Sequence, residues 1–177
     1  MKRIGIMIGS DSDLPQCLLG FKYLEGAQNR GRCEVVVIIT NSIHRNTEEV
    51  LRNLRLYNYL LDAWIIGAGW ANHLTGTCDA YLRNTLKDDK TRVFGVAFSD
   101  HNNNDNNLAA VLSIAKVPGT QVIYNSKYVG ENSFLDACMK ASEDDYDDLP
   151  PIKIGAPKPV VKRTLLEAIE DAQAKTK

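Results

Sequence analysis

Short apolar runs alternate along the chain with longer segments in which apolar residues recur at helical spacing. Runs that are apolar throughout are typical of strands buried on both faces of a sheet. They predict a parallel sheet of five strands. These runs are RIGIMIG at 3–9, CEVVVIIT at 33–40, DAWIIG at 62–67, TRVFGVAF at 91–98 and TQVIY at 120–124.

The segments between these runs are predicted to be helices. In 47–61, for example, Val50, Leu54 and Leu61 fall on one helical face. Strands that alternate with helices form parallel sheets covered on both sides and joined by right-handed crossovers. The predicted fold class is α/β, a doubly wound three-layer α/β/α sandwich. The other predicted helices are 14–28, with Pro15 in the first turn, 72–86, 108–117 and 130–142.

The pattern changes near the C-terminus, where SEDDYDDLPPIKIGAPKP is acidic and rich in proline. We predict one domain over 1–143, an exposed linker over 144–159 and a last amphipathic helix over 160–177. A helix beyond such a linker either packs on a neighbouring subunit or folds back on its own domain.

Composition narrows the classes of function. The 177 residues suffice for one domain with a real core, and a formal net charge of -1 provides no basic field for nucleic acid or an anionic membrane. The longest apolar run is far short of the roughly 20 residues that span a bilayer. The N-terminal MKRIGIMIGSDSD runs from a short apolar stretch into a polar turn, which indicates a strand and not a signal peptide.

Cysteine and histidine limit the chemistry further. The four cysteines are scattered and form no C-x-x-C pair, which argues against zinc and a disulfide framework and favours a reducing cytoplasm. Proton transfer near neutral pH has three histidines as candidates, His44, His73 and His101.

Ligands of doubly wound folds bind outside the carboxyl ends of the strands, so the residues after each strand are the first candidates for a site. GSDSD at 9–13 suits an anion, because glycine and small hydroxyl residues let main-chain N–H groups face it. NSIHRN at 41–46 sets Arg45, a good phosphate ligand, beside His44, which can carry a proton. In GAGWANHLTG at 67–76, glycines permit close approach of the backbone to a ligand.

Each motif also has a structural interpretation that the sequence leaves open. Ser12 or Asp13 suits a helix N-cap, the His–Arg pair suits a solvated turn, and His73 suits a structural histidine at a helix start. The polar loop SDHNNNDNN at 99–107 either closes over a substrate or is a mobile surface loop.

In this order and spacing, the motifs resemble those of the PurE family, the N5-carboxyaminoimidazole ribonucleotide mutases of purine biosynthesis. The family pattern G-S-x-S-D is matched at 9–13, S-A-H-R at 42–45 with Ile43 in the alanine position, and G-A-G-G-A-A-H-L-P-G at 67–76. A later S-I-x-x-x-P is matched by SIAKVP at 113–118. The similarity covers residues 3–124.

The resemblance implies a flavodoxin-like domain that forms a homo-octamer with active sites between subunits. It implies a reaction without a metal or organic cofactor, in which a carboxylate moves from the exocyclic nitrogen of the imidazole ribonucleotide to a ring carbon. His44 is implied as the acid–base catalyst. The residues implied to bind the ribonucleotide substrate are Ser10, Asp11, Asp13, Ser42, Arg45, Gly69, Ala71, His73 and Leu74.

Histidine suits this chemistry. A nitrogen-bound carboxylate loses carbon dioxide readily once the nitrogen is protonated, and the ring carbon must lose a proton after recarboxylation. A single group that performs both transfers needs a pKa near neutrality, where histidine starts. Because carbon dioxide offers few contacts, a tight and dry pocket must hold it beside the ring.

Three positions in the third motif depart from the family, since Trp70 replaces a glycine, Asn72 an alanine and Thr75 a proline. Trp70 either tightens the carbon dioxide pocket or points into a subunit contact. Three other functions remain open: carboxylation of aminoimidazole ribonucleotide by free carbon dioxide, PurE-like carboxylation of another nucleotide such as a nicotinic acid dinucleotide, and a non-catalytic nucleotide-binding assembly protein. The presence of both His44 and Arg45 argues against the last, because a binder needs the anion anchor but not the proton carrier.

Overall fold

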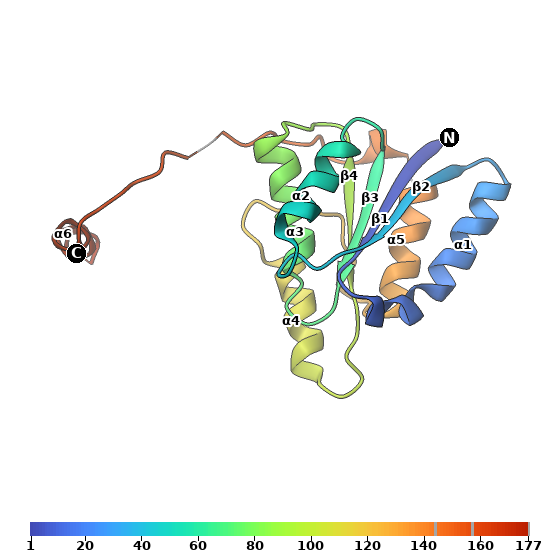
Figure 1. Ribbon diagram of the computed structural model, residues 1–177, viewed down its shortest axis with the longest axis horizontal. Helices are drawn as coiled ribbons and strands as arrows, with labels where there is room; N and C mark the ends of the chain where they lie inside the picture. The colour runs from blue at the N-terminus through green and yellow to red at the C-terminus, as the bar shows by residue number, and fades with distance from the viewer. Residues whose placement is uncertain (144, 157, 177) are drawn as a thin grey trace.

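A parallel sheet forms the centre of the protein, in a computed structural model that describes residues 1–143, 145–156 and 158–176. Its four strands lie in the order β2-β1-β3-β4, and helices cover both faces (Figure 1). The predicted α/β class with a parallel sheet is confirmed. The strands are β1 (Lys2–Ile8), β2 (Cys33–Thr40), β3 (Ala63–Ala68) and β4 (Arg92–Ala97).

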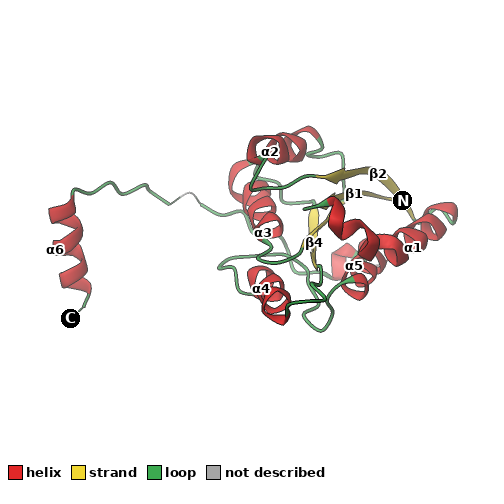
Figure 2. Cartoon of the chain, turned by 60° about the horizontal axis from the view of Figure 1, so that its bottom comes forward, coloured by secondary structure: helices red, strands yellow, loops and turns green. Residues whose placement is uncertain are grey.

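The helices divide into two layers, with α1 and α5 on one face of the sheet and α2, α3 and α4 on the other (Figure 2). Three further helical segments among the described residues are of other kinds, since η1 and η3 are 3-10 helices and η2 is a π-helix. The bounds are η1 (Asp11–Cys17), α1 (Leu18–Asn29), α2 (Thr47–Leu56), α3 (His73–Ala80), η2 (Tyr81–Thr85), α4 (Asn104–Ala115), α5 (Glu131–Glu143), η3 (Tyr146–Asp148) and α6 (Leu165–Lys175).

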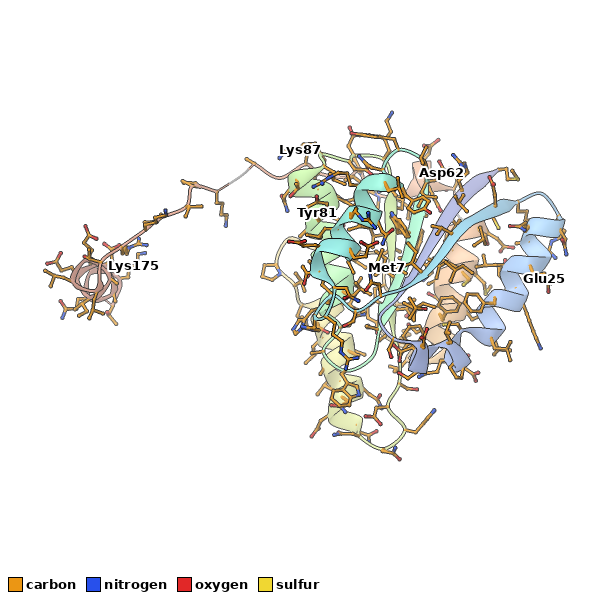
Figure 3. All side chains as sticks on the ribbon, viewed as in Figure 1. Met7, Glu25, Asp62, Tyr81, Lys87 and Lys175 are labelled. Carbon is orange, nitrogen blue, oxygen red and sulfur yellow. The ribbon has the colours of Figure 1, made fainter. Side chains whose placement is uncertain are left out.

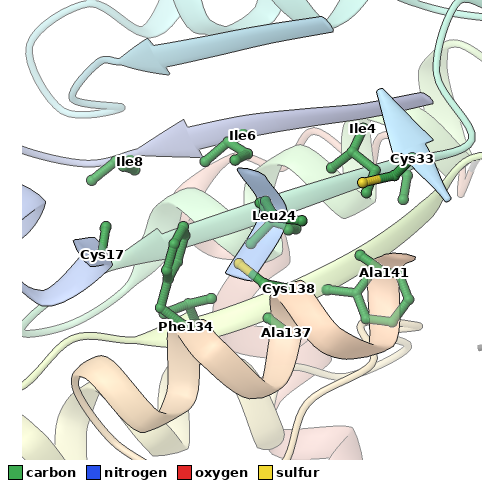
Figure 4. Close-up of a cluster of buried hydrophobic side chains, with 14 of the residues drawn as sticks. Ile4, Ile6, Ile8, Cys17, Leu24, Cys33, Phe134, Ala137, Cys138 and Ala141 are labelled. Carbon is green, nitrogen blue, oxygen red and sulfur yellow. The ribbon is translucent and has the colours of Figure 1, made fainter. Parts of the chain in front are cut away.

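Successive side chains of β1 point to opposite faces of the sheet and so contribute to the hydrophobic core on both faces. Ile4, Ile6 and Ile8 point to the layer of α1 and α5, where they meet Phe134 and neighbouring side chains (Figure 4). Met7 faces the other layer and is buried between the sheet and the helices beyond it (Figure 3). Both faces of the strand are therefore apolar, as expected of a central parallel strand.

The predicted fifth strand at 120–124 is wrong in extent. Ile123 makes one isolated parallel bridge with Phe94, in which the N–H of Gly95 donates to the Ile123 carbonyl at 2.9 Å. Turns on both sides keep the segment short. Gly119 adopts a φ of +76° just before it, and the Asn125 side chain accepts from the N–H of Lys127 at 3.2 Å just after it.

Several helix ends also differ from the prediction. The predicted helix 14–28 starts as the 3-10 helix η1, which contains Pro15, and becomes α-helical at Leu18. The helix predicted at 108–117 begins earlier, at Asn104, because the Asn103 side chain accepts from the N–H of Asp105 at 2.9 Å. Part of the polar loop is thus the capped first turn of α4.

The first part of the C-terminal region, around residues 150–153, makes hydrogen bonds with the domain. Arg92 donates to the Pro150 carbonyl at 2.6 Å, and Gln121 exchanges two hydrogen bonds with the main chain of Lys153, at 2.6 and 2.7 Å. Farther on, α6 lies apart from the sandwich (Figures 1 and 2), and the residues described in this helix are exposed. Its packing on a neighbouring subunit therefore stays a prediction.

Helices α1 and α5 approach each other closely at Gly20. A Cβ atom there would lie 2.3 Å from Cδ1 of Phe134 and 2.8 Å from Sγ of Cys138. We expect Gly20→Ala to lower the free energy of unfolding by about 1–3 kcal/mol, because the two helices must shift apart. Urea denaturation followed by circular dichroism measures the change.

Gly26 in the same helix provides the matched control, since a Cβ atom there meets only the flexible end of Arg30, at 3.2 Å. Gly26→Ala is expected to raise the free energy of unfolding by about 0.5–1 kcal/mol, because alanine loses less backbone entropy in a helix. Equal effects of the two substitutions would contradict the close packing at Gly20.

Candidate active site

A cavity of about 510 Å³ opens where β1, β2 and β3 end. It brings together all the predicted site residues except Asp11. Asp11, the first residue of η1, is exposed outside the cavity. The lining residues are Gly9, Ser10, Ser12, Asp13, Ser42, Ile43, His44, Arg45, Ala68, Gly69, Trp70, Ala71, His73 and Leu74.

The loop after β1 is fixed by its neighbour. The N–H of Gly9 donates to the Gly67 carbonyl at 2.8 Å, and a Cβ atom on Gly9 would lie 2.8 Å from that of Ala68. Glycine is therefore needed where the loops after β1 and β3 touch. The N-cap of η1 is Ser10, whose Oγ accepts from the N–H of Ser12 at 3.3 Å, so the prediction of Ser12 or Asp13 as the cap is wrong.

Asp13 does not cap η1, and it lines the cavity instead. Burial raises the pKa of its carboxyl to about 6, opposed by a hydrogen bond from the main chain of Gly69. A carboxyl group with this pKa exchanges its proton close to neutral pH, and above pH 6 it presents an acceptor for a ligand hydroxyl.

This pKa makes stability depend on pH. The folded-state pKa lies above the unfolded value, so the folded protein binds more protons between about pH 4 and 6 and the free energy of unfolding falls as pH rises through this window. Asp13→Asn removes the titration. We expect the variant to gain stability relative to the natural protein as pH rises from 4 to 7, measured by urea denaturation at each pH. A difference that does not change with pH would contradict the raised pKa.

The loop after β2 is a tight turn that presents two side chains. The Ser42 carbonyl accepts from the N–H groups of Arg45 at 3.2 Å and Asn46 at 2.9 Å. Ile43 is buried beneath the turn, with 8% of its surface exposed. His44 and Arg45 are exposed and line the cavity, so the turn is both solvated and part of the pocket wall.

His44 and His73 meet across the cavity. Nε2 of His44 lies 3.0 Å from Nδ1 of His73, and the rings are nearly perpendicular, with centroids 5.0 Å apart at 74°. In this hydrogen bond one of the two nitrogens donates and the other accepts. His73 is the first residue of α3, which fixes its position relative to the sheet.

Two departures from the family motif form a buried hydrogen-bond network. Asn72 caps α3 by accepting from the N–H of Thr75 at 3.1 Å, and it donates to the Val96 carbonyl at 2.9 Å. The Thr75 hydroxyl lies 2.9 Å from the Ile66 carbonyl oxygen. These bonds tie the start of α3 to β3 and β4, so Asn72 and Thr75 support the cavity wall from below.

The third departure, Trp70, is of a different kind. It adopts a φ of +56°, and 67% of its surface is exposed at the cavity. This backbone conformation costs a residue other than glycine about 1–2 kcal/mol. In the single chain Trp70 lines the cavity, and its contact with a neighbouring subunit stays a prediction.

Five lining residues were not predicted as binding residues, although all lie inside the three strand-end motifs and Trp70 was considered as a residue that tightens the carbon dioxide pocket. Their neighbours were named, so proximity in the motif was the available signal. His101 lies in the predicted loop but outside the cavity, where Asp100 instead binds Asn106 and Asn107 near the start of α4. The five are Gly9, Ser12, Ile43, Ala68 and Trp70.

The residues that the structure describes contain no group of three or more His, Cys, Asp or Glu side chains placed to hold a metal ion. Within the same residues, no helix has the length and apolar character needed to cross a membrane. All four cysteines are buried and unpaired.

Comparison with known proteins shows a similarity in fold. No protein-family model matches the chain, and no curated protein sequence matches it. Among solved structures, the chain is similar to PurE of Treponema denticola, with a TM-score of 0.50 and 22% sequence identity over 76% of this chain and 77% of that chain. The protein therefore has an α/β fold of the PurE type, with a cavity at the carboxyl edge of its sheet.

Proposed function

We propose that the chain is an N5-carboxyaminoimidazole ribonucleotide mutase of purine biosynthesis in the cytoplasm. It would form 4-carboxy-5-aminoimidazole ribonucleotide without a metal or organic cofactor. The observation that carries the proposal is the convergence of His44, Arg45 and His73 with Ser10 and Asp13 on one cavity. The PurE-type fold supports it, because these residues occupy the strand ends at which such folds bind ligands.

Substrate binding is assigned to the first two loops. Ser10, Ser42 and Arg45 provide hydroxyl and guanidinium donors for the phosphate, and Asp13 provides an acceptor for a ribose hydroxyl. The loop after β3 provides a largely apolar wall for the ring and for released carbon dioxide. Gly69, Ala71 and Leu74 are the small and apolar members of that wall.

His44 would move the proton. Protonation of the exocyclic nitrogen by His44 breaks the bond to the carboxylate and releases carbon dioxide, which the ring carbon then attacks. The proton lost from that carbon returns to His44, so the enzyme ends as it began. His73 holds the His44 ring through Nε2, which leaves Nδ1 of His44 for exchange with the substrate.

Oligomer formation would complete the pocket. His44, Arg45 and Trp70 are exposed in the single chain, which gives carbon dioxide a way out before it recombines. We propose a homo-octamer in which a neighbouring subunit closes this side and in which α6 packs on a neighbour through its exposed Leu166 and Ile169. Light scattering should then give eight times the chain mass of 19.7 kDa; a monomer with full activity would contradict this arrangement.

The decisive assay uses two substrates in parallel. Purified protein is mixed with fresh N5-carboxyaminoimidazole ribonucleotide, or with aminoimidazole ribonucleotide and bicarbonate, and the ring-carboxylated product is followed by absorbance. Fast turnover of the first substrate alone supports the mutase. Turnover of the second alone would make the protein a direct carboxylase, and no turnover of either would overturn the proposal.

A further inference from the structure

Trp70 is a large apolar side chain that lines the cavity and is mostly exposed. Its φ of +56° lies in the left-handed region that favours glycine, and its indole is 67% exposed. Among the described residues, no aromatic ring or hydrogen-bond acceptor engages the indole. Trp64 is the opposite case, because it is fully buried and packs against Tyr57 at 6.0 Å.

The distribution of chemistry around the cavity suggests what engages Trp70. Most polar and charged lining residues come from the loops after β1 and β2, whereas the loop after β3 contributes Gly69, Trp70 and Ala71, followed by His73 and Leu74 at the start of α3. A ribonucleotide has the same division, with phosphate and ribose at one end and a flat heteroaromatic ring at the other. Backbone strain often occurs at functional sites, and Trp70 combines it with a position in the cavity wall.

We propose that the indole of Trp70 stacks on the planar heteroaromatic ring of a bound ribonucleoside monophosphate and sets the preference for ligands that carry such a ring. The inference rests on the proposed function, which makes the cavity a ribonucleotide site. Trp70 acts as a binding and specificity residue, while Ser10 and Arg45 hold the phosphate.

The test compares a ligand that carries the ring with one that lacks it. Full-length protein and the variants Trp70→Ala and Trp70→Phe are titrated by calorimetry with aminoimidazole ribonucleotide and with ribose 5-phosphate. Stacking of a base on an aromatic side chain is worth enough that Trp70→Ala should weaken ribonucleotide binding about 5- to 140-fold. Binding of ribose 5-phosphate should stay within about twofold, and Trp70→Phe should retain most of the ribonucleotide affinity because it keeps an aromatic face.

Fluorescence supplies a second readout that a structural role would not give. The chain has two tryptophans, and Trp70 is the exposed one, so aminoimidazole ribonucleotide should change the emission of the natural protein but not that of Trp70→Phe, in which buried Trp64 remains. Equal weakening of both ligands by Trp70→Ala, or no weakening of either, overturns the stacking role while leaving the sugar-phosphate site in place. Failure of the natural protein to bind either ligand overturns the ribonucleotide site and the stacking role together.

Discussion

His44→Asn is expected to lower kcat by about 10²- to 10⁴-fold while ribonucleotide affinity stays within a few-fold of that of the natural protein. Asparagine keeps a polar group near His73, but it cannot exchange a proton near neutral pH. The phosphate donors of Ser10 and Arg45 are untouched, so binding should survive. Steady-state kinetics with N5-carboxyaminoimidazole ribonucleotide gives kcat, and calorimetry gives the affinity.

His101→Asn is the matched control, because this histidine lies in an exposed turn outside the cavity. Its kcat should equal that of the natural protein. If His44→Asn turned over substrate at the natural rate, a different residue would have to carry the proton. If it lost binding together with turnover, His44 would be part of the binding surface and not a separate proton carrier.

The sequence predicts this division of roles because parallel strands deliver their carboxyl ends to one edge. The runs 3–9, 33–40 and 62–67 are mostly apolar, so the position of the following motifs could be inferred. Burial on both faces is wrong for 33–40, because β2 lies at the edge of the sheet and only Cys33 in it is buried. The inferred position of the motifs brings His44 and His73 to the same cavity without a structure. The 3.0 Å distance between Nε2 of His44 and Nδ1 of His73 is not encoded in the apolar pattern.

The features that escaped prediction have different physical causes. Asn72 and Thr75 are polar residues in the first turn of a predicted helix, yet both are fully buried, and their side chains donate to the Val96 and Ile66 carbonyls. The segment 120–124 has strand-like composition, but the turns on either side limit it to one bridge. Burial of Asn72 and Thr75 is decided by contacts with β3 and β4, whereas truncation of the strand is decided by the adjacent turns.

A second buried polar cluster lies outside the cavity, in the segment η2 that follows α3. Arg83 has 2% of its surface exposed, and its Nε donates to Asp79 at 3.1 Å. Its two remaining nitrogens donate to the carbonyls of Asp88 at 2.9 Å and Thr91 at 2.7 Å. Burial lowers the pKa of the guanidinium, and the Asp79 carboxylate opposes that effect. One side chain thus satisfies three acceptors that water cannot reach.

Arg83→Met should therefore lower the free energy of unfolding by about 3–5 kcal/mol, because it leaves the Asp79 carboxylate buried without its counter-charge and two carbonyls without donors. Urea denaturation measures the loss, and Arg52→Met is the control, since its partner Glu49 is exposed and little change is expected. A double variant, Asp79→Leu with Arg83→Met, should recover part of the loss by removing the unpaired charge. If Arg83→Met lowered the free energy of unfolding no more than Arg52→Met, the stabilising role of the buried pair would be contradicted. Neither arginine lines the cavity, so the folded fraction of each variant should bind ligand with unchanged affinity.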